Sequence, residues 1–248
     1  MKIVADRVSK GHAGIPLPET TLAYETGRVT IAEAEVGDHP TVLALMMSGR
    51  MRTDSGQLTI DGADDSALVR ERIALVDAPD VSEPTGDLLL KDVVREELVF
   101  AGRSASRDSV ARAIAENGGA DYAGVRIADV PAGIRVRILT EIAAFRPGVR
   151  GIVITSPDRH GGDPRDWLAV ARELAERDFA VLVVCGYASA EIVRPLLPAN
   201  PAAFDAPAET SPDAAPDAAL DTAPGSIPGG TAATPDDFSY ETESERLA

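Results

Sequence analysis

Residues 155–164 combine the residue types best able to do chemistry: a histidine, an arginine and two aspartates in one short segment. An imidazole and carboxylates are ligands that zinc accepts, and the same groups can transfer protons. A metal or hydrolytic site built from His160, Asp158 and Asp163 is therefore one hypothesis. In the competing interpretation Asp163 caps a helix, the glycines turn the chain, and Arg159 and His160 are solvated or face a partner.

The other reactive residue types offer no second site. Cys185 is the single cysteine, and because it ends an apolar run we expect a buried core residue rather than a nucleophile. The remaining histidines, His12 and His39, lie far apart in the sequence, and no spacing typical of a metal site links them. We favour the competing interpretation of the 155–164 segment as well, and therefore predict no metal ligands in this chain.

A strand, a helix and a second strand frame the 155–164 segment. Residues 151–154 form a continuous apolar strand, Asp163 and Pro164 open an amphipathic helix, and residues 180–185 form the next apolar strand. Apolar strands joined through a helix indicate a parallel crossover in a sheet that is covered on both faces. The segment after residue 154 then lies at the carboxyl edge of the sheet, where α/β proteins bind ligands.

The N-terminal part of the chain reads mostly as short strands. Segments bounded by glycine or proline predict strands at residues 2–8, 21–24, 28–32, 57–60 and 73–76. Helical patterns cover residues 41–47, 89–101 and 106–116. Asp38 or His39 would cap the first of these helices, with Pro40 in its first turn.

Composition excludes several classes of protein. The 248 residues carry a formal net charge of -16, and Asp plus Glu outnumber Lys plus Arg 40 to 24, which argues against a nucleic-acid partner. One cysteine cannot support a disulfide framework, and no run approaches the roughly 18 apolar residues of a membrane span. Charges appear in the first residues before any signal-like stretch. We expect a soluble intracellular protein with one substantial core.

Residues 199–248 differ from the rest of the chain. This tail holds ten acidic residues against Arg246 alone, and seven of the 18 prolines. Such a composition cannot bury enough apolar surface to offset the entropy lost on ordering. We predict a disordered, acidic, Pro/Ala-rich tail that acts as a solubilising linker, with a short partner motif near residues 238–240 as the alternative.

A series of short motifs runs through residues 2–187 in a fixed order. They are Val8-Ser9-Lys10, Gly27, Gly49, Ser55-Gly56, Asp61-Gly62, then Gly133, Arg135 and Arg137, then Pro157, Asp163 and Pro164. In order and spacing they resemble the nucleotide-binding subunits of ATP-binding cassette (ABC) transporters. The resemblance implies an α/β, P-loop NTPase-like domain over residues 1–198. That domain would have a parallel core sheet, an antiparallel N-terminal β lobe and a small helical segment at about 80–130.

The resemblance places residues 34–41 at the family's phosphate loop. Such a loop needs glycines, a lysine for the phosphates and a hydroxyl for magnesium. The family positions retained here, which the resemblance implies for nucleotide binding, are Gly37, Thr41, Gly133 and Asp163. Pro40 stands at the lysine position and offers neither a cation nor an N–H. Glu35 and Asp38 place carboxylates where a triphosphate would lie, and Asp38 as a helix cap would occupy the anion site.

The family's catalytic motifs are also changed. By the resemblance, Thr155 and Ser156 stand where two carboxylates end the Walker B strand, and neither can act as a general base near neutral pH. Residues 130–134 keep little of the signature motif, Gly186 replaces the switch histidine, and no Q-loop glutamine is visible near 77–79. Together these changes favour a protein that is not an ATPase and that needs no cofactor.

Three functions remain open. The first is a catalytically inactive ABC ATP-binding-protein homologue that serves as a binding or regulatory partner of a membrane transport component. The second is an ABC subunit that still binds ATP and Mg²⁺ and hydrolyses ATP slowly. The third is a soluble scaffold or an unrelated enzyme that uses the 155–164 segment.

The resemblance also implies partners. They are an integral membrane transporter subunit and, through a homodimer or a heterodimer, a second ATP-binding subunit. The expected location is the cytoplasm, and peripheral attachment to the inner face of the cell membrane stays open. The docking face would be residues 80–102, whose helix carries an apolar stripe of Leu89, Leu90, Val93, Val94 and Leu98. In the competing interpretation this stripe packs only against its own core.

Overall fold

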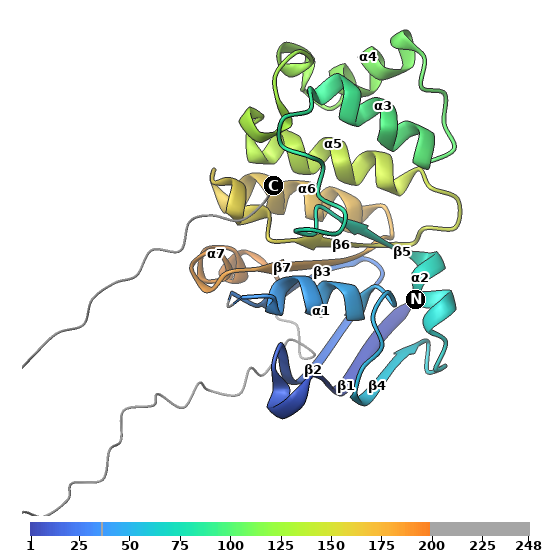
Figure 1. Cartoon of the computed structure of the whole chain (residues 1–248), viewed down its shortest axis with the longest axis vertical. Coiled ribbons are helices and arrows are strands. Elements are labelled where there is room, and N and C mark those ends of the chain that lie inside the picture. The colour runs from blue at the N-terminus through green and yellow to red at the C-terminus, as the bar shows by residue number, and fades with distance from the viewer. Residues whose placement is uncertain (36, 199–248) are drawn as a thin grey trace, which may run out of the picture. The chain divides into compact units, whose positions relative to one another are not determined.

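A computed structural model describes residues 1–35 and 37–198. The predicted disordered tail, residues 199–248, lies outside the described residues. Within the described residues the chain forms a three-stranded sheet, a four-stranded sheet and seven α-helices (Figure 1). None of the helices in this part of the chain is long and apolar enough to cross a bilayer.

The smaller sheet is antiparallel and has the strand order β2-β1-β4. Its strands are β1 (Lys2–Lys10), β2 (Leu17–Glu25) and β4 (Ser55–Ile60). Side chains alternate between buried and exposed along β2, as in a sheet that covers a core with one face. Gly56 of β4 lies against a bulge in β1. Only glycine fits at this position, because a Cβ there would lie 2.2 Å from the carbonyl oxygen of Arg7.

The larger sheet is parallel and has the strand order β3-β7-β6-β5. Its strands are β3 (Arg28–Glu33), β7 (Ala180–Cys185), β6 (Gly151–Thr155) and β5 (Ile73–Val76). Every residue of β5, β6 and β7 is buried, because helices or strands cover both faces of this sheet. The predicted parallel crossover is confirmed. Strands β6 and β7 pair in parallel, and the chain between them forms a helix.

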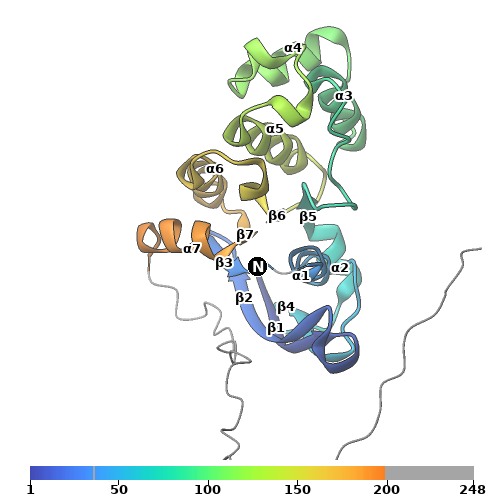
Figure 2. The same ribbon diagram turned by 60° about the vertical axis from the view of Figure 1, so that its left-hand side comes forward.

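Helix α1 (His39–Met47) lies between the two sheets (Figures 1 and 2). It packs against β6 and β7 of the parallel sheet and against β1 and β2 of the antiparallel sheet. Leu43, Met46 and Met47 join side chains of both sheets, such as Ile3 and Val153, in one buried cluster. This shared core explains why the helix is apolar on all sides.

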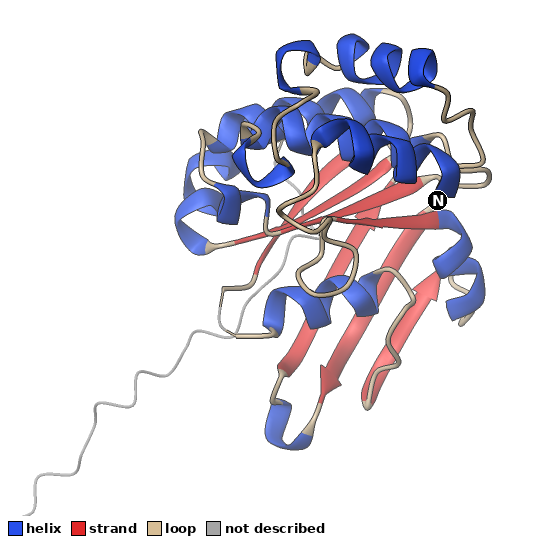
Figure 3. Cartoon of the chain, turned by 45° about the horizontal axis from the view of Figure 1, so that its top comes forward, coloured by secondary structure: helices blue, strands red, loops and turns tan. Residues whose placement is uncertain are grey.

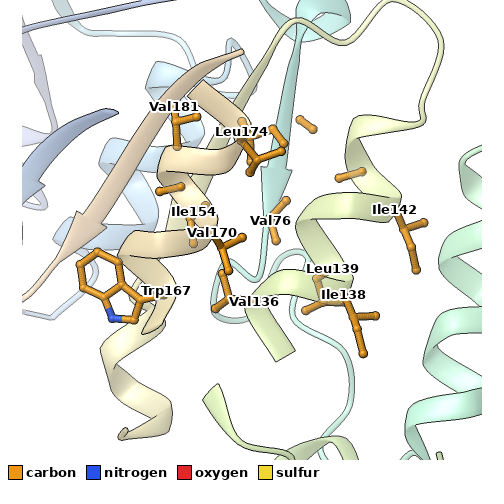
Figure 4. Packing of buried hydrophobic residues seen from close by; sticks show 14 of the residues in the cluster. Val76, Val136, Ile138, Leu139, Ile142, Ile154, Trp167, Val170, Leu174 and Val181 are labelled. Atoms are coloured by element: carbon orange, nitrogen blue, oxygen red, sulfur yellow. The ribbon is translucent and has the colours of Figure 1, made fainter. Parts of the chain in front are cut away.

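Helices α5 (Ala132–Ala144) and α6 (Pro164–Glu176) cover the opposite face of the parallel sheet (Figure 3). Trp167 and Val170 on α6 and Val136 on α5 belong to the same buried cluster as Ile154 and Val181 of the sheet (Figure 4). Asp163 caps α6 as predicted, because its carboxylate accepts the backbone N–H of Arg165 at 2.9 Å.

Helices α3 (Leu90–Phe100) and α4 (Arg107–Glu116) form the predicted helical segment. The expectation that the stripe on α3 offers a docking face is wrong. Leu90, Val93, Val94 and Leu98 are all buried in the large core beneath the helix. The exposed apolar side chains here are Val81, Val99 and Phe100.

All of the predicted strands are present, and the three predicted helical patterns correspond to α1, α3 and α4. The sequence interpretation proposed no helix for α2 (Ser66–Arg72), α5 or α7 (Tyr187–Val193). Helices α2 and α7 have only seven residues each, so tertiary packing rather than a local pattern stabilises them. Helix α5 has 13 residues, eight of which are buried, so its apolar side chains do not form a single clear stripe.

Candidate functional site

The four parallel strands end at one edge of their sheet, and the segments after them carry polar residues to that edge. Asp77 follows β5, residues 156–163 follow β6, Gly186 follows β7, and Ala34 and Glu35 follow β3. In α/β folds this carboxyl edge is where ligands bind. Two groups of charged side chains occupy it, one near β5 and the other near β3.

The first group is a buried ion network, here named the Asp77 cluster. Its members are Asp77, Glu83, Arg135, Arg159 and His160. The Asp77 side chain is fully buried, and Arg135 donates to both of its oxygens, from Nε at 2.9 Å and from Nη2 at 2.6 Å. Such a two-point ion pair fixes the geometry of both side chains. It joins the end of β5 to the first turn of α5.

Arg159 connects the same carboxylate to the segment after β6. Its Nη2 lies 3.1 Å from Asp77 Oδ1 and 3.1 Å from Glu83 Oε1. Its Nη1 donates to the backbone carbonyls of Asp77 at 2.7 Å and Thr155 at 2.9 Å. One guanidinium therefore holds the ends of β5 and β6 together.

His160 and Arg159 do not behave as the sequence interpretation expected. Only 14% of the His160 side chain and 23% of the Arg159 side chain is exposed, and both contact Asp77. His160 Nε2 lies 3.0 Å from Asp77 Oδ2. The expectation that these two side chains are solvated or face a partner is therefore wrong, because a buried carboxylate from a distant strand binds them instead.

The network sets the ionisation of Asp77. Burial raises the pKa of this carboxyl, but hydrogen bonds from His160 and Arg135, with the charges of Arg135 and Arg159, outweigh burial. The net effect holds the pKa of Asp77 well below its usual range. Asp77 is therefore an ionised structural partner, and it is not poised to take up a proton near neutral pH.

A metal ion does not fit this cluster. One ligand atom each from Asp77, Glu83 and His160 lies within 4.8 Å of the others, which is a spacing that a cation could bridge. Two guanidiniums already occupy that space and balance the two carboxylates, so a further cation would meet like charge. The hypothesis of a metal site at His160, Asp158 and Asp163 fails as well, since the three side chains have different partners.

The second group of charges is acidic and lies beside β3 and β7. Asp158 Oδ2 accepts the backbone N–H of Gly186 at 2.9 Å. A Cβ on Gly186 would lie 3.0 Å from that oxygen and 3.0 Å from Glu35 Oε1, so the two carboxylates converge there. Burial first, and then the charges of Asp158, Glu33 and Glu35, raise the pKa of the Cys185 thiol. We define the acidic corner as Glu33, Glu35 and Asp158. Arg194 pairs with Glu33, and no ion pair involves Glu35 or Asp158 among the described residues, so the corner keeps an excess of negative charge.

Helix α1 begins at the same corner. Gly37 precedes it with a φ of 53°, and Pro40 and Thr41 form its first turn. Asp38 is at the N-cap position but its side chain makes no capping hydrogen bond, which corrects the sequence prediction. Two causes are visible: Asp38 has helical rather than extended dihedral angles, and Pro40 lacks the N–H that a cap would bind.

The other two retained family positions lie on the far side of the parallel sheet. Gly133 is in the first turn of α5, where a Cβ would stand 2.8 Å from the Cβ of Asp166 on α6. Asp163 is half exposed and pairs with Arg165 at 3.2 Å. Both residues thus have a local structural role, in helix packing and in helix capping.

Thr155 is the last residue of β6, Ser156 follows it, and the carbonyls of both accept hydrogen bonds from Arg159. Thr155 is fully buried, and its hydroxyl oxygen has no hydrogen-bond partner among the described residues. Ser156 adopts a left-handed conformation with a φ of 46° and donates its N–H to the carbonyl of Val184 at 2.7 Å. Neither residue brings a carboxylate to the edge of the sheet.

Sequence reasoning missed three members of the Asp77 cluster as partners of the 155–164 segment, namely Asp77, Glu83 and Arg135. One signal was present, because Asp77 directly follows a buried strand and so had to lie at the carboxyl edge. Nothing in the sequence shows that Arg135, 58 residues further on, meets it.

A groove lies next to the Asp77 cluster, with a volume of about 480 Å³. We name it the 81–100 groove after the residues that line it, among them Val81, Glu83, Leu88, Glu96, Phe100 and the nearby Arg146. Val81 is 51% exposed and Phe100 is 73% exposed. The groove thus combines exposed apolar side chains with the carboxylates of Glu83 and Glu96.

Comparison with solved structures identifies the fold. The chain matches a nucleotide-free ATP-binding cassette from an ABC transporter with a TM-score of 0.58 and 15% identity, over 79% of this chain and 85% of the other. It also matches a dimeric bacterial ABC transporter cassette with a TM-score of 0.54 and 17% identity, over 74% and 87%.

A third match is cbiO1 from Clostridium perfringens, part of the ABC transporter complex cbiONQ, with a TM-score of 0.52 and 15% identity over 74% and 77%. The sequence matches no protein-family model and no curated protein. At these identities the likeness concerns the fold alone. The chain has the α/β fold of ABC transporter ATP-binding cassettes, as the motif series in its sequence predicted.

Proposed function

We propose that this protein is an ABC ATP-binding-subunit homologue that does not hydrolyse ATP and that acts as a binding or regulatory partner of a membrane transport component. The observation that carries the proposal is the acidic corner at the start of α1. Glu35 and Asp158 converge there on Gly186, at the sheet edge where the fold would hold a phosphate chain.

Electrostatics argue against a triphosphate at this corner. A carboxylate and a phosphate oxygen about 4 Å apart repel each other by about 1 to 4 kcal/mol near a protein surface, and two carboxylates lie there. Pro40 supplies no compensating cation in the first turn of α1. A bound Mg²⁺ would reduce the repulsion but would not replace the missing lysine, so the residues present do not fit a nucleotide.

The catalytic side of the edge supports the same proposal. Hydrolysis needs a general base to orient and deprotonate the attacking water. Thr155 and Ser156 have no carboxylate, and the Asp77 carboxylate is buried and bound by two arginines and a histidine. We infer that this chain binds a partner without turning over ATP itself.

The 81–100 groove is the surface we propose for the membrane component. Its exposed apolar side chains, Val81 and Phe100, lie beside the acidic side chains of Glu83 and Glu96. The solved cassettes of this fold include one that is dimeric and one that is part of a transporter complex. For this chain a dimer with a second ATP-binding subunit, identical or different, is part of the proposal.

The first experiment is a titration with Mg²⁺-ATP, followed by calorimetry and by thermal unfolding. The proposal expects no heat of binding and no shift, whereas a ligand at a hundredfold excess over its Kd would add about 2.7 kcal/mol to stability. A saturable signal would instead favour the second function, an ABC subunit that retains ATP binding. A matched variant, Glu35→Gln/Pro40→Lys/Asp158→Asn, restores the cation and removes two acids, and it is expected to gain a shift.

The second experiment tests the groove. The full chain is co-expressed with the membrane protein encoded nearest to its gene, and the complex is isolated from detergent extracts. Phe100→Asp should lower recovery of that membrane protein at least tenfold, because the charge would enter an apolar contact. Tyr187→Asp, an equally drastic change at a site 58% exposed on α7, is the control. Equal recovery with both variants would contradict the docking surface.

A further inference from the structure

A second large groove lies between β3 and α6, at the point where the described part of the chain ends. Its volume is about 550 Å³, and it is lined by Arg28 and Val29 of β3, by Arg172 and Glu176 of α6, and by residues 196–198. We name it the β3–α6 groove. Because the last described residue forms part of its wall, residues 199–248 begin at this groove.

Part of the wall of the β3–α6 groove is apolar and open to solvent. Leu196 is 42% exposed, and Val29 and Leu197 are half-buried against the large core beneath them. An aromatic side chain that becomes covered buries roughly 150 to 250 Å² of surface, more than most other side chains can bury. The groove therefore offers a seat for one large apolar side chain.

Arg172 supplies a cation beside that apolar wall. Its Nη2 donates to the backbone carbonyl of Leu196, which holds the guanidinium at the groove. In the part of the chain that the structure describes, no ion pair involves Arg172, so its other N–H groups can donate to a further acceptor. A carboxylate on the occupant of the groove would be such an acceptor.

The balance of charge also favours an acidic occupant. Two arginines, Arg28 and Arg172, line the β3–α6 groove against one carboxylate, that of Glu176. The 81–100 groove has the opposite balance, with three carboxylates against one arginine. An acidic segment is therefore attracted to the β3–α6 groove and repelled from the 81–100 groove.

The sequence just after the groove contains a segment that matches it. Asn200-Pro201 is a pair that favours a turn, and Phe204-Asp205 then places an aromatic ring next to a carboxylate. The six residues from position 199 to Phe204 can span up to about 20 Å, so after a turn the ring can return to the groove. A groove lined by Arg103, Arg112 and Glu116 has the same balance of charge, but the tail does not begin there.

We propose that the β3–α6 groove is a binding site for residues 201–205 of the same chain, with Phe204 on the apolar wall and Asp205 paired with Arg172. These residues form a strap that closes the groove, and the disordered tail predicted from composition begins after the strap rather than at residue 199. An aromatic and acidic segment of another protein could then enter only by displacing the strap. The inference goes beyond the proposed function, because it involves neither a nucleotide nor a membrane component.

The experiment compares two chymotrypsin sites in the full chain. Chymotrypsin cleaves after Phe204 and after Phe238, and mass spectrometry follows the initial rate at each site. Each rate is divided by the rate for a synthetic peptide of the same local sequence. Cleavage after Phe204 should be at least about tenfold slower in the protein than in its peptide, because a site that is open one-tenth of the time is cut at one-tenth of the rate. Cleavage after Phe238 should match its peptide.

Two matched pairs of variants test where the strap binds. Leu196→Asp puts a charge into the apolar wall and should bring cleavage after Phe204 to within about twofold of the peptide rate. Ile192→Asp, at a side chain that is 39% exposed and does not line the groove, should leave the protection unchanged. Asp205→Asn should lower the protection about two- to fivefold, the size of one surface ion pair, whereas Asp213→Asn in the same tail should not.

Equal rates after Phe204 in the protein and in its peptide would overturn the proposal. Protection after Phe238 alone would also overturn it, since the distal motif would then be the occupant. Protection that rises with protein concentration would do the same, because the occupant would come from a second copy. Should Leu196→Asp disturb the fold, Asp205→Asn still tests the pairing, since it changes only the tail. No readout uses ATP or a membrane protein, so a failure here is distinct from a failure of the proposed function.

Discussion

Two regions of the same sheet edge differ in whether cations compensate their carboxylates. At the ends of β5 and β6, the buried Asp77 carboxylate is matched by two arginines and a histidine. At the ends of β3 and β7, Glu35 and Asp158 converge on Gly186, and the partner of Asp158 is a backbone N–H rather than a cation. The two regions belong to one sheet, yet only the first is electrically balanced.

The difference separates the requirements of folding from those of binding. A buried charge destabilises the fold unless it is paired, so the sequence has to supply Arg135 and Arg159 for Asp77. Water solvates the acids at an exposed edge, so the fold tolerates them. The unpaired acids instead repel any anionic ligand, which is the basis of the function proposed above.

The largest effect is expected from removing the matched carboxylate. Asp77→Ala leaves Arg135 buried without its partner and should lower the free energy of unfolding by about 3 to 5 kcal/mol. Asp163→Ala, which removes a half-exposed helix cap, should cost about 1 kcal/mol. Urea unfolding of both variants measures the two values, and similar losses would mean that the network is not a major stabilising element.

The pH dependence of stability should show the same contrast. Because the pKa of Asp77 is lower in the folded than in the unfolded state, its ionised form stabilises the fold above the unfolded value of about 3.9. That stabilisation is lost as the pH falls toward the folded pKa, at up to about 1.4 kcal/mol per pH unit. Asp77→Asn, which keeps the shape, should flatten the unfolding free energy below about pH 4 relative to wild type. Parallel curves for the two proteins would contradict this.

Neutralising the acidic corner should have a smaller effect of opposite sign. Glu35→Gln/Asp158→Asn removes repulsion between carboxylates at low ionic strength and is expected to stabilise the fold by about 0.5 to 1 kcal/mol. The gain should shrink at 1 M salt, where screening is nearly complete. Thermal unfolding at two salt concentrations measures it, and a destabilised double variant would show that the corner is held by contacts other than these.

The smallest effect is expected at the exposed end of the same segment. Arg165→Met breaks a solvated ion pair with Asp163 and leaves the backbone cap intact, so stability should change by less than about 0.5 kcal/mol. Hydrogen exchange at residues 156–163 should stay at the wild-type rate. A clear increase would mean that Arg165, and not Arg159 alone, holds this segment.

Most of the fold was predictable because its strands are short apolar runs between glycines and prolines. The run 180–185 indicated a fully buried parallel strand, and Asp163-Pro164 indicated the start of α6; the structure confirms both. Helices α2 and α7 were not predicted, since one turn or two of mixed residues gives little periodicity and depends on packing.

The candidate site was less predictable for a physical reason. The polar residues after β6 were identified, but their partner Asp77 comes from another strand and Arg135 from a helix that was not predicted. Ion pairs between distant segments leave no local pattern in a sequence. The apolar stripe on α3 was visible in the sequence, but its role was not. An amphipathic helix has the same sequence pattern whether its apolar side faces the protein's own core or a partner, and here it faces the core.

The position of α1 has a consequence for how this protein could change over evolutionary time. Leu43, Met46 and Met47 hold its body between the two sheets, whereas Gly37 and Asp38, just before the helix, are exposed. Substitutions at these two exposed positions therefore disturb the core little. A lineage could therefore change the approach to this helix, keep a fully formed α/β scaffold, and put that scaffold to another use.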